Sequence, residues 1–257
     1  MNLEKEKLLV ISPHADDEVM GCFGLINKIK NGGGKVYVQI LSLGGFDKIE
    51  GTRITKEEWK NEVTKVSKFL NIDKYEIANF NDEIIHIDTM PQQELIELLE
   101  FRSKIAISKI KPTIVAIPTV FSTHQDHTQA YRVAIAALRP HSQKTSHMPH
   151  LVVSYESPEY YFWSAASEFG KFSPNFYVNL TKNDINKKIK AMNIYKTQIR
   201  PDKRDGSSLT ALARIRGNEI GLDYAEAYHV HRLFSVSYTH LRAHETDSYL
   251  VCRLLLE

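Results

Sequence analysis

The apolar residues of this chain alternate between short continuous runs and longer stretches with helical spacing. Residues 8–11 form a continuous apolar run and residues 113–118 a similar one, as is typical of strands buried on both faces of a parallel sheet. Between residues 17 and 30 the apolar side chains recur at helical spacing, and the glycines at 32–34 end that helix. A strand at 36–43 then completes a βαβ unit, whose crossover we expect to be right-handed.

The same alternation continues through most of the chain. We predict further helices at 56–70, 92–110, 127–138, 182–198 and 209–217, and further strands at 75–80, 151–155 and 176–180. Repeated strand–helix pairs indicate an α/β fold, Rossmann-like, with a mostly parallel sheet and helices on both faces. We assign residues 1–236 to this single domain. Residues 237–257 follow neither period and resemble translated adapter sequence, so we predict that this tail is not native.

The composition excludes several classes of function. With 257 residues, 42% hydrophobic and 25% charged, the chain resembles an ordinary globular protein. Thirty-three basic and 31 acidic residues give a net charge of +2, which argues against a nucleic-acid or membrane-surface partner. No apolar stretch approaches the roughly 20 residues of a transmembrane segment, and two cysteines are too few for a disulfide scaffold. We therefore expect a cytoplasmic enzyme or binding protein, with no prediction of its oligomeric state.

Two polar clusters follow the carboxyl ends of predicted strands. The first, Pro13-His14-Ala15-Asp16-Asp17-Glu18, comes directly after the strand at 8–11. The second, His124-Gln125-Asp126-His127, lies in the loop after the strand at 113–118. Ligands bind at the carboxyl edge of an open parallel sheet, so we expect both clusters to meet there.

Imidazole and carboxylate groups in this arrangement suit a divalent metal ion. His14 and Asp17 are three residues apart, so they face the same way on a first helical turn. Together with His127 they supply three ligands and leave an open position for water, as hydrolytic zinc sites do. Asp16 and His124 then lie close by without binding the metal, and a closed structural site has no use for them. We predict Zn²⁺ as the cofactor; the same ligands also suit Fe²⁺.

Each cluster taken alone has a simpler interpretation. Asp16 or Asp17 could cap the helix that follows, because aspartate is a favoured N-cap residue. His124 and His127 could be surface histidines of a loop. Two adjacent carboxylates and three histidines at one edge of the sheet favour the metal site over both of these alternatives.

The two clusters together resemble the motifs of a known family. Pro-His-Ala-Asp-Asp-Glu at 13–18, followed by Gly21, and His-Gln-Asp-His at 124–127 are similar to the motifs of the PIG-L/LmbE-like family of zinc-dependent N-acetylglucosaminyl deacetylases. The usual first motif has proline where this chain has Ala15, which leaves every chemical group in place. The resemblance runs from about residue 8 to residue 233 and implies a Rossmann-like fold.

The resemblance implies a role for each matched residue. His14, Asp17 and His127 would bind the metal, which agrees with the assignment from spacing. Asp16 would be the general base. His124 would stabilise the oxyanion or protonate the leaving amine.

Further residues are matched with less support from a motif. Asp126 would orient a metal-binding histidine, as carboxylate partners of such histidines do. Arg53 and Asp82 are the nearest counterparts of an arginine and an aspartate that hold sugar hydroxyls in family members. A C-terminal pattern common in bacterial members has counterparts at residues 195–198, 216–217 and 224–227, for which the resemblance implies no role.

These residues predict hydrolysis of the N-acetyl group of a small amino-sugar conjugate that contains N-acetylglucosamine. The closest alternative is an amidase that acts on a thiol-conjugated amino sugar. A nucleotide-sugar transferase would need a glycine-rich turn after the first strand, and the sequence has none there. A further alternative of another class is a non-catalytic sugar-binding module that contains a metal.

Overall fold

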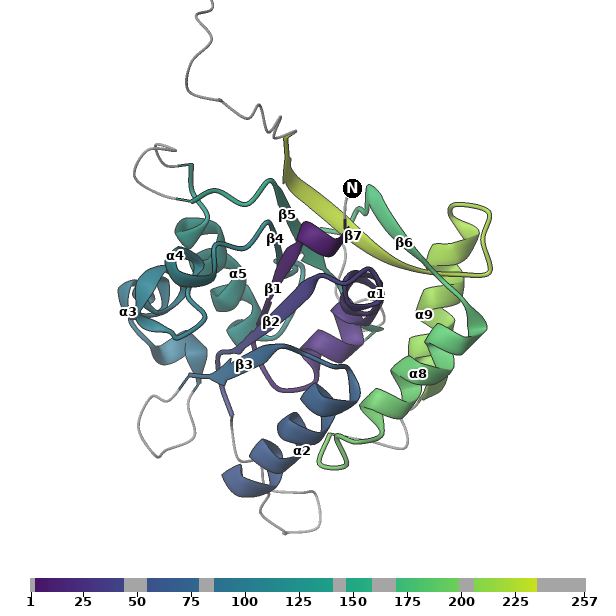
Figure 1. Cartoon of the computed structure of the whole chain (residues 1–257), viewed down its shortest axis with the longest axis horizontal. Coiled ribbons are helices and arrows are strands. Elements are labelled where there is room, and N and C mark those ends of the chain that lie inside the picture. The colour runs from purple at the N-terminus through teal and green to yellow at the C-terminus, as the bar shows by residue number, and fades with distance from the viewer. Residues whose placement is uncertain are drawn as a thin grey trace, which may run out of the picture.

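One mixed sheet forms the centre of the molecule (Figure 1). The computed structural model describes residues 3–43, 55–78, 86–140, 147–158, 170–198 and 206–234. Within these residues the sheet has seven strands in the order β3-β2-β1-β4-β5-β7-β6. They are β1 Lys7–Ser12, β2 Lys35–Ile40, β3 Lys74–Ile77, β4 Ile114–Pro118, β5 Leu151–Tyr155, β6 Phe176–Leu180 and β7 Tyr224–Leu233. Strands β1 to β5 are parallel, whereas β7 is antiparallel to both β5 and β6.

Helices cover both faces of this sheet, with a separate apolar core under each layer (Figure 1). One layer consists of α1 Asp17–Asn31, α2 Lys56–Phe69, α8 Lys182–Met192 and α9 Gly206–Asn218. The other consists of α3 Gln92–Glu97, α4 Ile107–Ile110 and α5 Gln125–Ala137. Short 3-10 turns lie at Leu3–Lys5 and Ile87–Thr89, and a π-helical turn lies at Leu98–Arg102. The predicted fold class, α/β with a mostly parallel sheet, is confirmed.

Strand β1 shows why a continuous apolar run forms the middle of such a sheet. Leu8 and Val10 point into one core, and Leu9 and Ile11 point into the other. All four side chains are almost completely buried, so no polar residue could alternate with them.

The sheet changes direction of winding at β1, and this places the two polar clusters. The chain moves from β1 outward to β2 and β3, and then returns to the other side of β1 to form β4 and β5. Strands β1 and β4 are therefore neighbours, and the loops that follow them meet at the carboxyl edge of the sheet.

The structure differs from the predicted elements at two helices and at one strand, since the strand predicted at 36–43 ends at Ile40. The helix predicted at 92–110 is wrong as a single element: α3 runs into the π-helical turn, and Ser103 then adopts an extended backbone with φ −56° and ψ 151°. The Ser103 hydroxyl donates a hydrogen bond to Gln39 Oε1 at 2.6 Å and accepts one from the N–H of Ile105 at 3.0 Å, which draws the backbone out of the helix. The helix predicted at 182–198 ends at Met192.

Strand β7 is absent from the sequence-based predictions. Its third residue, Glu226, is buried and accepts hydrogen bonds from the Gly24 N–H at 2.6 Å and from Lys188 Nζ at 2.7 Å. A charged residue on a buried strand breaks the apolar pattern by which the other strands were identified. The predicted tail at 237–257 lies outside the described residues, and the domain boundary at 236 stays a prediction.

None of the helices described here combines the length and the apolar character needed to cross a bilayer. The cytoplasmic location stays a prediction.

Candidate metal centre

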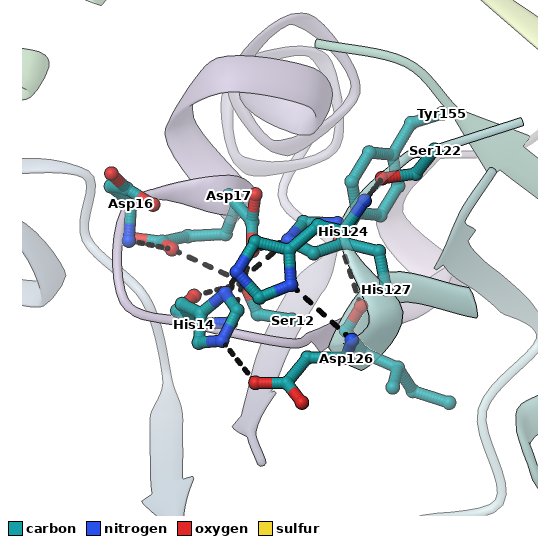
Figure 2. Close-up of polar contacts among 11 residues, drawn as sticks. Ser12, His14, Asp16, Asp17, Ser122, His124, Asp126, His127 and Tyr155 are labelled. Atoms are coloured by element: carbon teal, nitrogen blue, oxygen red, sulfur yellow. Dashed lines mark hydrogen bonds and ion pairs between the residues drawn. The ribbon is translucent and has the colours of Figure 1, made fainter. Parts of the chain in front are cut away.

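The two polar clusters face each other across the junction between β1 and β4 (Figure 2). The first occupies the loop after β1 and the first turn of α1. The second occupies the N-terminus of α5, where His124 is the N-cap residue. Of the eight predicted site residues, the structure brings six to this place: His14, Asp16, Asp17, His124, Asp126 and His127.

Three of these side chains form a compact triangle of donor atoms. His14 Nδ1 lies 3.2 Å from His127 Nε2, and Asp17 Oδ2 lies 3.7 Å from the first atom and 3.4 Å from the second. Ligands of a tetrahedral zinc ion, each at about 2.05 Å from the metal, are about 3.3 Å apart. The Asp17 and His127 side chains are 2% exposed and that of His14 is 14% exposed, so solvent reaches the triangle beside His14. The donor set therefore fits a divalent ion.

A hydrogen bond to Asp126 orients the His14 ring. Asp126 Oδ2 lies 2.9 Å from His14 Nε2, and Asp126 Oδ1 accepts the Asp88 N–H at 3.1 Å. The proton of a neutral His14 ring is then on Nε2, which leaves the Nδ1 lone pair for a metal. Burial raises the pKa of Asp126, but the hydrogen bond and charge of His14 and the Asp88 N–H outweigh it and hold this pKa below its ordinary value.

His124 lies beside the donor triangle. Its ring centroid is 4.9 Å from that of His14 and 5.1 Å from that of His127. The ring atom Nδ1 of His124 accepts the backbone N–H of Asp126 at 3.2 Å, and the backbone N–H of His124 donates to Ser122 Oγ at 3.0 Å. Because Nδ1 is an acceptor, the proton of a neutral His124 ring is on Nε2.

Asp16 is buried and belongs to none of the candidate metal-binding groups in the described chain, and its side chain lies apart from the three donors (Figure 2). It occupies the N-cap position of α1, yet its side chain makes no capping hydrogen bond. The Asp17 carboxylate accepts the His14 N–H at 3.0 Å, a bond to the preceding loop rather than to the helix. Helix capping therefore does not account for these two carboxylates.

The remaining predicted residues, Arg53 and Asp82, lie outside the described residues, and their roles stay predictions. Sequence reasoning missed the partners of Glu18, which directly follows the paired aspartates. Glu18 accepts hydrogen bonds from Tyr195 and from the Asp16 N–H. Burial raises the pKa of Glu18 against the opposing effect of these hydrogen bonds.

A second missed feature is an ion pair at the carboxyl end of β5. Arg216 donates to both oxygens of Glu156, from Nε at 2.5 Å and from Nη2 at 2.7 Å, and its Nη1 lies 2.6 Å from Glu219 Oε1. The Arg216 and Glu156 side chains are only 5% and 4% exposed. Burial raises the pKa of Glu156, although Arg216 acts in the opposite direction. Arg216 and Tyr195 both belong to the C-terminal pattern for which the resemblance implied no role.

Comparison with solved structures finds the same fold in proteins of different activities. The conserved protein TT1542 from Thermus thermophilus is 24% identical, with a TM-score of 0.68 over 90% of this chain and 98% of that chain. The N,N'-diacetylchitobiose deacetylase from Pyrococcus horikoshii is 20% identical, with a TM-score of 0.64 over 88% and 83%. GalB, the 4-carboxy-2-hydroxymuconate hydratase from Pseudomonas putida, is 17% identical, with a TM-score of 0.66 over 90% and 98%. At these identities the likeness shows the fold alone.

Comparison by sequence identifies the family. No curated protein matches this chain. The family model PIG-L, described as GlcNAc-PI de-N-acetylase, matches residues 9–138, a span that contains both polar clusters, all of β4 and most of β1. The chain belongs to the PIG-L family.

Proposed function

We propose that this protein is a metal-dependent hydrolase that removes the N-acetyl group from a small molecule containing N-acetylglucosamine. Membership of a family described as de-N-acetylases supports a deacetylase. The observation that carries the proposal is the triangle of His14 Nδ1, Asp17 Oδ2 and His127 Nε2, with edges of 3.2 to 3.7 Å. The His124 ring lies beside that triangle, with its centroid 4.9 Å from that of His14, and Asp16 belongs to the same polar cluster as His14 and Asp17, so the site has two further polar groups for acid–base chemistry.

His14, Asp17 and His127 would hold the metal. A divalent ion bound there, Zn²⁺ in this proposal with Fe²⁺ as the alternative, polarises a carbonyl oxygen and lowers the pKa of water towards ~7. Asp126 keeps the proton of His14 on Nε2, so that Nδ1 stays available as a ligand.

Asp16 and His124 would carry the proton transfers. The Asp16 carboxylate accepts a proton from the water that attacks the acetyl carbonyl carbon. His124 Nε2–H donates a hydrogen bond to the oxygen that becomes negatively charged, and the proton held by Asp16 passes to the departing nitrogen as the C–N bond breaks. Acetate and a free amine leave.

The test combines metal analysis with a substrate panel. We expect the purified protein to contain zinc or iron and to release acetate from at least one member of a library of N-acetylglucosaminides. Asp16→Ala and His124→Ala should lower turnover roughly a hundredfold or more with the metal retained. Asp73→Asn is a matched control, because Asp73 binds Lys30 and the Val36 N–H, remote from both polar clusters, and turnover should be unchanged.

Each of the other outcomes has a definite meaning. Loss of metal from Asp16→Ala would make Asp16 a ligand and contradict its role as base. Cleavage of thiol-conjugated amino sugars alone would support the amidase alternative. A metal-containing protein that cleaves no amide in the panel would contradict a hydrolase and favour the sugar-binding module.

A further inference from the structure

A fully buried hydrogen bond connects the C-terminal part of the chain to the loop that carries Asp16. Tyr195 lies just after α8, and its hydroxyl donates to Glu18 Oε1 at 2.5 Å. The exposed fractions are 0% for Tyr195 and 1% for Glu18. The other oxygen, Glu18 Oε2, accepts the Asp16 N–H at 3.1 Å and the Ser12 hydroxyl at 3.4 Å. One carboxylate therefore links Tyr195 to the Asp16 backbone.

The backbone of Asp16 has an unusual conformation. Its φ is 111° and its ψ is −28°, in a region that favours glycine. The other non-glycine residues with positive φ in the described chain, Asn71 and Lys111, have φ of 56° and 50°, close to the ordinary left-handed value. A non-glycine residue so far from the common regions persists only where its surroundings hold it, and such residues cluster at active sites.

Contacts on both sides of Asp16 hold this conformation. On the C-terminal side, the Asp16 carbonyl accepts the N–H groups of Val19 at 3.0 Å and Met20 at 2.9 Å, which fixes it to the start of α1. On the N-terminal side, the Asp16 N–H is bound by the Glu18 carboxylate. The Ser12 hydroxyl also donates to the His14 carbonyl at 2.9 Å, so the same small network includes the first histidine of the cluster.

We infer that Glu18 and Tyr195 are positioning residues for Asp16. Tyr195 holds one oxygen of Glu18, the other oxygen holds the Asp16 N–H, and the resulting backbone conformation sets the direction of the Asp16 carboxylate. Tyr195 lies beyond residues 9–138, the span that matches the family model, so the C-terminal part of the chain contributes to the site through this bond. The inference rests on the proposed function only in the role of Asp16 as the base.

The chain offers a matched control for this bond. Tyr228 is also completely buried, and its hydroxyl donates to the buried carboxylate of Glu226 at 2.6 Å. That carboxylate binds the Gly24 N–H in the middle of α1, away from the loop that carries Asp16. Tyr195→Phe and Tyr228→Phe therefore remove the same chemical group from similar surroundings, and a merely structural hydroxyl would give the same result in both.

The expected result is a difference in catalysis with similar stability. Both variants should show similar falls in melting temperature. Tyr195→Phe should lower kcat by about tenfold to a hundredfold, because a misplacement of about 1 Å has effects of this size, with KM and zinc affinity close to wild type. Tyr228→Phe should keep the wild-type kcat.

A second pair of variants tests the link through Glu18. In Glu18→Gln the amide oxygen can accept the Asp16 N–H while the amide nitrogen donates to the Tyr195 hydroxyl, so we expect kcat to be retained. Glu18→Ala removes both bonds and should lower kcat as Tyr195→Phe does. Equal loss in Glu18→Gln and Glu18→Ala would overturn the positioning role of these hydrogen bonds.

A crystal structure of Tyr195→Phe gives a readout that does not depend on activity. We expect the Asp16 φ to change and its carboxylate to shift, with the His14, Asp17 and His127 triangle kept. An unchanged Asp16, or a wild-type kcat in Tyr195→Phe, would overturn the inference. Absence of acetate release by the wild type would instead overturn the proposed function, and the crystal structure would still decide whether Tyr195 holds Asp16.

Discussion

Replacing Asp126 with asparagine tests how His14 is prepared to bind a metal. Both carboxylate oxygens of Asp126 are acceptors in the structure: Oδ2 faces His14 Nε2 at 2.9 Å, and Oδ1 accepts the Asp88 N–H at 3.1 Å. Asparagine has the same shape but only one acceptor oxygen, and its other terminal group is a donor. It therefore cannot satisfy both partners.

Either orientation of the new amide weakens metal binding. With its nitrogen towards His14, the amide donates to Nε2, and the ring proton moves to Nδ1, the atom that would bind the metal. With its nitrogen towards Asp88, the amide leaves Nδ1 free for the metal, but two donors then meet in a largely buried place. The metal-bound state needs this orientation, so it costs about 1–3 kcal/mol relative to the metal-free state, which can adopt the first one. This free energy corresponds to roughly 5- to 150-fold weaker binding, in line with the roughly 10- to 100-fold effect of losing a partner of a metal-binding histidine.

The assay is the zinc dissociation constant, measured by competition with a chromophoric chelator. Asp126→Asn should bind Zn²⁺ more weakly by the factor above, and Asp73→Asn, remote from both polar clusters, should bind as wild type does. Wild-type affinity in Asp126→Asn would refute the view that Asp126 places the proton on His14. An equal loss in both variants would indicate a general effect on the fold.

Three further predictions concern stability and are measured by thermal or urea unfolding. Arg216→Met leaves the buried Glu156 carboxylate without its partner and should lower the free energy of unfolding by about 3–5 kcal/mol; unchanged stability would contradict a tight ion pair. Desolvation by its neighbours and the charge of His229 lower the pKa of His231 to about 4, below the ordinary value of about 6.5, although this side chain lies at the surface, where solvent weakens the effect on stability. The unfolded chain therefore takes up this proton first, so the stability lost as pH falls from about 6.5 to 4 should be smaller in His231→Gln, and equal loss would contradict the shift. Gly21→Ala places a Cβ 2.8 Å from the Glu156 carbonyl and against the Tyr155 ring, so it should destabilise by about 1–3 kcal/mol; a wild-type melting temperature would show that the backbone can move apart.

The sequence predicts the parallel part of the fold well because its strands are buried on both faces. Strands β1, β4 and β5 lie within a residue of the predicted runs at each end, since two apolar cores leave no polar position to confuse the pattern. The meeting of the two polar clusters also follows from topology alone, because each comes directly after one of two neighbouring strands.

What the sequence does not predict depends on partners far away along the chain. The helix is interrupted at Ser103, whose hydroxyl donates a hydrogen bond to Gln39. The Glu226 carboxylate can be buried in β7 because it accepts hydrogen bonds from Lys188 and from the Gly24 N–H. Tyr195 donates to a carboxylate 177 residues earlier in the chain. The spacing of apolar residues along the sequence carries no information about contacts between such distant residues. The roles proposed for Asp16, His124 and the metal ligands stay predictions until they are measured.

The antiparallel strand β7 also dictates the order in which the molecule can assemble on the ribosome. Within the described residues β6 pairs with no strand other than β7, although it is synthesised more than forty residues before that strand. Until β7 emerges, β6 has no place in the sheet, one side of β5 is an open edge that could pair with another chain, and the Gly24 N–H lacks its acceptor. The nascent protein therefore depends on β7, the last strand of its described residues, to pair β6 and to cover the free edge of β5.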